Sequence, residues 1–345
     1  MRKVIREICC AILFILIGVL LFFTTDRVLR IKSCKQIDKY YTLEHNIVDV
    51  LFVGSSHCYR NINPAILYEQ DGIASYVLGT ASQPIWNSYY FTVEGLKTQK
   101  PKLIVIDCYK TAVNSEYVDS AITIKALSGM HYSKNRMDAV KASVENPKEW
   151  MEYFIGLPMY HNRYQEVTVE DYGRNYGNEY YEYFLGFLPI DKPIEETIPG
   201  NLGDVTQKKE ISVKNKQYLD KIIDLADKND IELLFVITPF CGKAERAQRY
   251  YNTLAEYLHT KGIPFINGNL LYDELQLDGE TDFGKGNHLS HTGADKYSAF
   301  LSTYLKEHYE LPDRRGNKKY VRWQKNVEWF QNVGDSSGTD MNESE

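Results

Sequence analysis

Short apolar runs alternate with longer stretches of helical periodicity along most of the chain. The runs are apolar at nearly every position, which is typical of strands buried on both faces of a parallel sheet. They cover residues 49–53, 74–79, 102–109, 231–240 and 263–267. The stretches with apolar residues at helical spacing cover 65–71, 84–98, 212–229, 243–261 and 292–308. The pattern predicts an α/β fold of three layers, an open doubly wound parallel sheet covered by helices.

Residues 110–205 interrupt this alternation between the third and the fourth predicted strands. The segment is rich in Tyr, Asn and Lys, and it holds a helix-like stretch at 134–144. Loops at the carboxyl ends of parallel strands build the binding sites of doubly wound folds. We therefore expect a helical, aromatic insertion that acts as a lid or as a substrate-recognition element.

The N-terminus carries a long apolar run. Residues 8–23 are uncharged, and Thr24 and Thr25 extend the run to 18 residues, near the lower limit for a membrane-spanning helix. A secretory signal peptide would have a shorter apolar region and an A-x-A-like cleavage site, whereas this run ends in TTDRVL. We interpret it as an uncleaved single-pass anchor with the large domain outside the cytoplasm. Basic residues flank both ends of the run, so charge alone does not set the orientation.

These segments divide the chain into four parts. We predict an anchor at 1–25, a linker at 26–47, the α/β domain at 48–310 and a polar tail at 311–345. Within the tail, the sequence KKYVRWQKNVEWFQ at 318–331 is typical of a short amphipathic helix. The final residues, DSSGTDMNESE, have the composition of a disordered segment.

Composition excludes some classes of function. The net charge of −6 and the pI of about 5.8 do not indicate nucleic-acid binding. The six cysteines lack CxxC or metal-like spacing, so they predict neither a disulfide framework nor a metal site. Cys58, Cys108 and Cys241 lie in or near apolar strand ends, where buried thiols are expected. We predict no metal and no cofactor.

The first predicted strand ends in residues that carry chemistry. The apolar run at 50–53 leads directly into the sequence GSSH at 54–57. Hydroxyls there either cap a helix or present a nucleophile at the carboxyl edge of the sheet, where ligands bind. A nucleophilic serine needs a base, and GNHLSHTGADKYSAFL offers His288, with His291 as a rival, at the last predicted helix. That loop returns to the same edge, so Ser56 and His288 are expected to meet although 232 positions separate them.

Three sequence blocks resemble those of the SGNH/GDSL hydrolases, over roughly residues 48–307. LFVGSSHCYRNINP resembles the Gly-x-Ser block of the nucleophile, and SYVLGTASQP resembles the block whose glycine supplies an oxyanion-hole amide. NHLSHTGADKYS resembles the block of the catalytic histidine. The chain looks most like the membrane-anchored, cell-envelope branch of this superfamily, which includes proteins of teichoic-acid D-alanylation and exopolysaccharide O-acetylation.

The resemblance implies a reaction and a set of site residues. Ser56 is the implied nucleophile, His288 the implied base, and the amides of Ser56 and Gly79 are the implied oxyanion donors. The implied reaction is hydrolysis or transfer of an acyl ester, acetyl or D-alanyl, on a cell-envelope glycan. The implied partners are that acylated glycan or an acyl donor, and a membrane-bound O-acyltransferase. Further residues expected to line the site are His57, Gln83, Asn87, Tyr109 and Lys110.

The sequence departs from the family pattern at two positions. The acid of the family lies three residues before the histidine, where this chain has Lys285. Asp282, six residues before His288, is the candidate acid, and a backbone carbonyl is another group able to orient the ring. The third oxyanion donor of the family is an asparagine after the third strand, where this chain has Tyr109 and Lys110.

Lys285 leaves two classes of function open. One is a Ser–His dyad that acts as an esterase with water as acceptor, or as a transferase with a sugar hydroxyl as acceptor. The other is a weak or inactive protein of the same fold that binds an envelope polymer or a membrane acyltransferase through the insertion. His161 and Arg163 in the insertion are candidate contacts for an anionic polymer, with a solvated or paired role as the alternative. A phospholipase-like esterase would need a larger apolar pocket than this polar insertion suggests.

Overall fold

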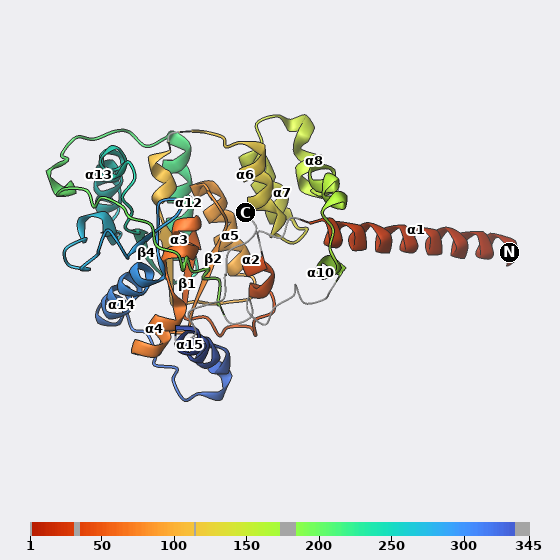
Figure 1. The fold of residues 1–345 in the computed structure, drawn as a ribbon. Helices are drawn as coiled ribbons and strands as arrows, with labels where there is room; N and C mark the ends of the chain where they lie inside the picture. Colours follow the sequence, from red (N-terminus) through yellow and green to blue (C-terminus); the bar gives the residue numbers. More distant parts are fainter. Residues whose placement is uncertain (1, 31–34, 114, 173–183, 335–345) are drawn as a thin grey trace.

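The chain folds around one parallel sheet, in a computed structural model that describes residues 2–30, 35–113, 115–172 and 184–334. Five strands pair in the order β2-β1-β3-β4-β5, and every pairing is parallel (Figure 1). Each lies inside a run that the sequence predicted as a strand, apart from β1, which extends one residue beyond its run, so the α/β fold class is confirmed. The strands are β1 (Val50–Gly54), β2 (Ser75–Gly79), β3 (Leu103–Asp107), β4 (Glu232–Ile237) and β5 (Phe265–Asn267).

The strand order reverses at β1, which fixes where the helices and the binding crevice lie. The connection from β1 to β2 runs one way along the sheet, and the later connections run the other way. Because such crossovers are right-handed, their helices cover opposite faces, and a crevice opens at the carboxyl ends of β1 and β3. Helix α4 (Pro64–Asp71) packs against α14 (His291–His308), and α5 (Ile85–Gly95) packs against α12 (Val213–Lys228). Helix α13 (Ala244–Thr260) joins β4 to β5.

Local sequence sets where these helices begin and end. Asn63 caps α4, because its side chain accepts a hydrogen bond from the Ala65 amide and Pro64 occupies the first helical position. Gly72 ends the same helix in the left-handed conformation, at φ 69°. Ser290 caps α14 by accepting from the Gly293 amide. The cap therefore fixes the point at which the preceding turn enters α14, near the edge of the sheet.

The insertion forms a group of short helices beside α5. Helix α7 within it packs directly against α5, and it corresponds to the stretch predicted at 134–144. Residues 114 and 173–183 of the predicted insertion lie outside the described residues. The helices are α6 (Ser120–Ser128), α7 (Lys134–Ser143), α8 (Trp150–Ile155), α9 (Leu157–Tyr160) and α10 (Val169–Tyr172).

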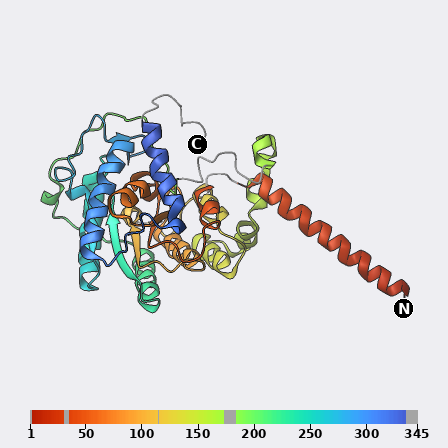
Figure 2. The ribbon, with the colours of Figure 1, turned by 90° about the horizontal axis from the view of Figure 1, so that it is seen from below.

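Helix α1 (Arg2–Leu29) projects away from the body of the molecule (Figure 2). It is long and apolar enough to cross a membrane, a property that signal sequences share. Its inner end packs against the insertion, where α1 contacts α9 and α10 (Figure 1). The carboxylate of Asp26 is buried there, and it accepts hydrogen bonds from Arg30 at 2.7 Å, Tyr132 at 3.2 Å and Tyr160.

The Arg163 guanidinium completes this contact. It donates to the carbonyls of Leu29 at 3.0 Å and Arg30 at 2.7 Å. Leu29 ends α1 and Arg30 follows it, so neither carbonyl has a partner farther along the helix. Arg163 therefore has the paired structural role that was the alternative to contact with a polymer.

Residues 35–47 of the predicted linker pack against the body of the molecule. Helix α2 (Lys35–Tyr40) lies in this segment, and Ile37, Tyr40, Leu43 and Ile47 are all buried. The Tyr40 hydroxyl donates to the Gly95 carbonyl at 2.9 Å and so ties the segment to α5. These four apolar side chains thus belong to the hydrophobic core.

The polar tail also contributes to the fold up to residue 334. Helix α15 (Val321–Gly334) overlaps the amphipathic helix predicted at 318–331, and it packs against α4. Trp323 is fully buried, and its indole N–H donates to the Ser75 carbonyl on edge strand β2 at 2.8 Å. Arg314 pairs with Asp49 at 2.7 Å. The tail thereby covers part of the edge strand β2, whose backbone groups would otherwise be open to pairing. Its predicted disordered end, 335–345, lies outside the described residues.

Candidate active site

The two serines in the turn after β1 have different roles. Ser55 is the N-cap of α3 (Ser56–Asn61), and its hydroxyl accepts from the His57 amide at 3.3 Å. The same hydroxyl donates to the Asp107 carboxylate at 2.7 Å, and the Ser55 amide donates there at 3.0 Å. The capping interpretation of the sequence therefore applies to Ser55, and it leaves the hydroxyl of Ser56 free for another partner.

Gly54 and Asp107 fix the position of this turn. A side chain at position 54 would lie 2.4 Å from the Asp107 Cβ, so only glycine lets the two strand ends come this close. Asp107 is buried at the end of β3, and burial raises the pKa of its carboxyl group. It also accepts from the Tyr109 amide at 3.0 Å. Sequence reasoning missed Asp107, although a charged residue that ends an apolar strand at the carboxyl edge was an available signal.

A short hairpin presents His288 to the serine. Strands β6 (Phe283–Gly284) and β7 (His288–Leu289) are antiparallel, and Gly284 pairs with His288. The Leu289 amide donates to the Asn61 side chain at 3.0 Å, which ties the hairpin to α3. Nε2 of His288 lies 2.9 Å from Oγ of Ser56. The structure thus brings together the serine and the histidine that the sequence paired.

A main-chain carbonyl orients the imidazole ring. Nδ1 of His288 lies 3.0 Å from the carbonyl oxygen of Lys285. Because a carbonyl oxygen only accepts hydrogen bonds, Nδ1 carries the proton in the neutral ring, and Nε2 keeps its lone pair. Nε2 is then able to accept the proton of the Ser56 hydroxyl. This is the carbonyl alternative that the sequence left open beside Asp282.

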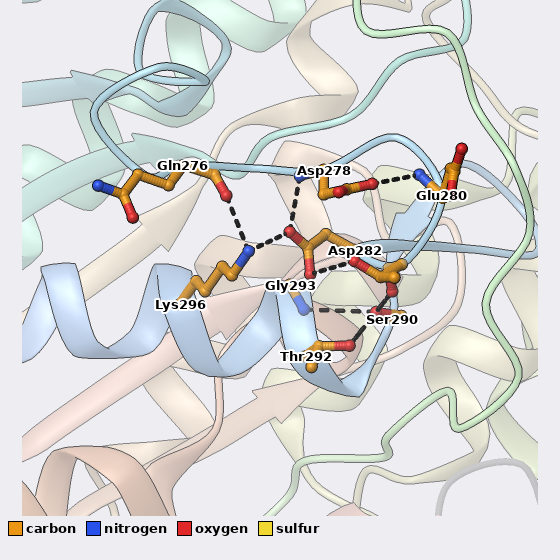
Figure 3. Close-up of polar contacts among 9 residues, drawn as sticks. Gln276, Asp278, Glu280, Asp282, Ser290, Thr292, Gly293 and Lys296 are labelled. Atoms are coloured by element: carbon orange, nitrogen blue, oxygen red, sulfur yellow. Dashed lines mark hydrogen bonds and ion pairs between the residues drawn. The ribbon is translucent and has the colours of Figure 1, made fainter.

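Asp282 has a different role from the one predicted (Figure 3). Its side chain is buried, and its carboxylate lies 2.5 Å from Nζ of Lys296 on α14. The same carboxylate accepts from the Asp278 amide at 2.7 Å. The prediction of Asp282 as the acid that orients His288 is therefore wrong, because the carboxylate is used in an ion pair while Nδ1 faces Lys285.

The two predicted oxyanion donors lie at the carboxyl ends of the neighbouring strands β1 and β2. Ser56 begins α3, and the amides of a first helical turn have no acceptor within the helix. Gly79 ends β2 opposite Gly54, and a Cβ at position 79 would lie 2.3 Å from the Gly54 carbonyl oxygen. Glycine is thus required there by the close approach of the strands. The donor roles of both amides remain predictions.

Three of the residues predicted to line the site surround the dyad. His57 is buried, and its ring stacks on Tyr109 with centroids 3.5 Å apart and lies 4.8 Å from the His288 ring. Burial holds the pKa of His57 well below its usual value, and the charge of Lys110, with that of His288 when its ring is protonated, lowers it further. Burial also lowers the pKa of Lys110, whose Nζ lies 5.8 Å from the Tyr109 centroid.

Two other predicted lining residues are engaged in the scaffold. Gln83 is buried, accepts from the Thr80 amide at 3.0 Å and donates to Ser88 at 3.1 Å. The Asn87 side chain accepts from Ser143 on α7 at 2.9 Å. These contacts link α5 to its own loop and to the insertion.

The rival histidines lie in other surroundings. His291 begins α14, and its Nε2 lies 3.5 Å from the Asp295 carboxylate. His161 is exposed, and its Nδ1 faces the Pro158 carbonyl at 2.7 Å. Neither contact involves Ser56, so the geometry favours His288 as its partner. The buried thiols predicted at Cys58, Cys108 and Cys241 are confirmed, and burial raises the pKa of each.

Solved structures of similar fold include a GDSL-like lipase from Bacteroides thetaiotaomicron VPI-5482. It is 12% identical at a TM-score of 0.42, and the match covers 81% of this chain and 98% of that chain. A G-D-S-L family protein from Desulfitobacterium hafniense DCB-2 is 12% identical at a TM-score of 0.38, covering 74% and 98%. An acetyl xylan esterase from the rumen bacterium Butyrivibrio proteoclasticus is 10% identical at 0.32, covering 76% and 64%. At these values the likeness concerns the fold alone.

The name GDSL, carried by two of these proteins, is that of the superfamily which the sequence blocks resemble. No protein-family model matches the chain, and no curated protein matches it.

Proposed function

We propose that the chain is an SGNH-type serine esterase or O-acyltransferase that works through an acyl-enzyme on Ser56. One observation carries this proposal: Oγ of Ser56 lies 2.9 Å from Nε2 of His288, at the carboxyl edge of the sheet. The hydroxyl of serine is a weak nucleophile, and a base within hydrogen-bond reach activates it. The carbonyl of Lys285 supports that base by holding the tautomer in which Nε2 accepts.

The first half of the reaction forms the acyl-enzyme. Oγ of Ser56 attacks the carbonyl carbon of the ester while its proton moves to Nε2 of His288. The negative charge that develops on the carbonyl oxygen is stabilised by the amides of Ser56 and Gly79. The bond to the alcohol oxygen then breaks, the alcohol takes the proton from Nε2, and the acyl group remains on Ser56.

The second half returns the enzyme to its starting state. Water or an acceptor hydroxyl attacks the acyl carbon and gives its proton to Nε2. Collapse of the intermediate then breaks the bond to Oγ, which regains the proton. Water as acceptor makes the protein an esterase, and a sugar hydroxyl makes it a transferase.

We also propose where and on what the protein acts. The apolar helix α1 supports a single-pass anchor, and we place the large domain outside the cytoplasm because the proposed substrates lie there. The resemblance of the sequence blocks to the cell-envelope branch supports acetyl or D-alanyl esters of an envelope glycan as substrates. A membrane-bound O-acyltransferase is the proposed protein partner, because it would supply acyl groups at the same surface.

A fluorophosphonate probe tests the proposal on the full chain in detergent micelles. We expect a single adduct that maps to Ser56 by mass spectrometry and that is absent from Ser56→Ala and His288→Ala. Ser212→Ala is the matched control, because that hydroxyl caps α12, a helix that carries neither member of the dyad, and its loss should leave Ser56 reactive. No adduct, under conditions that label a known serine hydrolase, would favour the inactive, glycan-binding alternative.

A further inference from the structure

A pocket of about 700 Å³ opens between the turn at Tyr109–Ala112 and the first turn of α13. The mechanism described above makes no use of it. The described residues that line it include four aromatic side chains, two cationic side chains and no carboxylate. The aromatic residues are Tyr109, Phe240, Tyr250 and Tyr251, and the cations are Lys243 and Arg246.

One wall of this pocket is shared with the dyad. Asn287, which lines the pocket, directly precedes His288. Its side chain is fixed to Gly242, accepting from the amide at 2.6 Å and donating to the carbonyl at 3.2 Å. Tyr109 stacks on His57, whose ring lies 4.8 Å from that of His288. A ligand in the pocket therefore lies beside the base.

The pocket is positive in a chain of net charge −6. Lys243 and Arg246 are both exposed, and Lys243 occupies the N-cap position of α13 while Arg246 lies in its first turn. Lys110 and Lys209 add positive charge, with Nζ atoms 5.8 Å and 5.6 Å from the centroids of two lining tyrosines. Glu245 belongs to the same helical turn but does not line the pocket. Cations on an exposed rim attract an anionic ligand.

The position of the base tells which part of an ester would occupy the pocket. In the proposed reaction, Nε2 of His288 returns its proton to the departing alcohol. The alcohol part must therefore lie on the His288 side of the scissile bond, next to Asn287. The acyl part lies on the opposite side, near the amides of Ser56 and Gly79.

We infer that this pocket binds the alcohol part of the substrate, a sugar ring that carries an anionic group, either phosphate or carboxylate. Aromatic side chains provide flat apolar faces for the C–H surface of a sugar, and the tyrosine hydroxyls provide polar edges. Lys243 and Arg246 supply charged hydrogen bonds to the anion. The assignment to the alcohol part rests on the proposed function, whereas binding of an anionic sugar does not.

Binding of simple sugars to the full chain tests the pocket without catalysis. The Ser56→Ala variant in detergent micelles is titrated with glucose 6-phosphate, with glucuronate and with glucose in a calorimeter. We expect at least one anionic sugar to bind about tenfold more tightly than glucose, and the two anions tell phosphate from carboxylate. The double substitution Lys243→Gln and Arg246→Gln should weaken that binding roughly ten- to a hundredfold, since charged hydrogen bonds are lost.

Lys228→Gln, which removes an exposed positive charge from α12, is the matched control and should leave binding unchanged. Equal binding of glucose and both anions, unchanged binding in the double variant, or no binding of any sugar would each overturn the inference. Hydrolysis of 4-nitrophenyl acetate by the unsubstituted chain tests the dyad separately. Anion binding without hydrolysis would remove the esterase proposal and leave the pocket as a binding site.

Discussion

At the scale of single residues, the orientation of the base depends on the main chain. The carbonyl of Lys285 faces Nδ1 of His288 at 3.0 Å, where the superfamily pattern would place an acid. A carbonyl holds the same tautomer as a carboxylate does, but it has no full charge to stabilise the imidazolium that forms during the reaction. We therefore expect a dyad that is active and slower than a complete triad.

Removing the side chain of Lys285 should leave this arrangement in place. Because the contact comes from the main chain, Lys285→Ala is expected to change kcat/KM for 4-nitrophenyl acetate by less than about tenfold. Loss of an orienting acid costs about 10⁴ in a serine protease triad. Steady-state hydrolysis by the full chain measures the difference, and a loss near that size would show that the lysine side chain itself takes part.

Asp282→Asn should affect stability more than activity. The substitution breaks the ion pair with Lys296, whose side chain is 37% exposed, and leaves the His288 ring facing Lys285. We expect the free energy of unfolding to fall by about 1–3 kcal/mol, seen as a lower urea midpoint. A loss of activity near 10⁴ with an unchanged midpoint would instead restore Asp282 as the acid.

His57 predicts how stability depends on pH. Its pKa in the folded chain is held low by burial and by the nearby positive charges, so the unfolded chain binds more protons below about pH 6.5. Stability should therefore fall as the pH is lowered through that range, by at most about 1.4 kcal/mol per pH unit from this group. Urea midpoints measured between pH 5 and 7 should show a shallower slope in His57→Gln, and an equal slope would contradict this account.

The sequence could predict some site residues because their signals are local. Ser56 and His288 lie in blocks of recognisable composition, and strand order brings both to one edge. The sequence offered a backbone carbonyl only as an alternative to Asp282 for orienting the ring, because a backbone contact depends on the path of a turn. Asp107 was missed because its partner, Ser55, lies 52 positions earlier and belongs to another strand end.

At the scale of elements, the hairpin of β6 and β7 decides where the base lies. Its turn contains Gly286 at φ 79° and Asn287 at φ 66°, both left-handed. A Cβ at position 286 would lie 2.9 Å from Nδ1 of His288, so the turn also leaves room for the ring. Glycine meets both requirements, and asparagine tolerates this backbone conformation better than most residues do.

Gly286→Ala separates these two requirements when it is compared with Gly262→Ala. Gly262 has φ 70° and open space around it, so both variants strain the backbone, by about 1–2 kcal/mol, and only one crowds the ring. We expect similar losses of stability and a fall in kcat/KM of about tenfold or more for Gly286→Ala alone. Equal activities of the two variants would show that the ring tolerates the contact.

Elements with strong periodicity were predicted well, and packed polar segments were not. The five strands and their helices have runs of apolar residues that identify them without reference to the rest of the chain. Residues 35–47 and the tail to residue 334 are polar on average, and they pack through a few apolar side chains. Ile37, Tyr40 and Trp323 are such side chains, and their burial depends on surfaces distant in sequence.

At the scale of the whole molecule, α1 is held by the insertion. Asp26→Ala removes the carboxylate that Arg30, Tyr132 and Tyr160 share, a loss of about 1.5–3 kcal/mol in this contact. Hydrogen exchange in lipid nanodiscs should become roughly ten- to a hundredfold faster in α9 and at the inner end of α1. Glu7→Ala, at the exposed outer end of α1, should change neither. Unchanged exchange in Asp26→Ala would mean that other contacts are enough to hold α1 against the insertion.

The contact between Asp26, Arg163 and the insertion has a consequence for encounter with substrates. A catalytic domain on a flexible tether samples a deep volume above a bilayer, whereas one fixed to its own membrane helix keeps a constant height and tilt. With α1 in a bilayer, diffusion becomes two-dimensional, and the site meets esters only within a thin layer parallel to the surface. A polymer whose length exceeds the depth of that layer must bend before its distal units reach the site. The stiffness of the polymer, as well as its chemistry, would then govern which of its positions react.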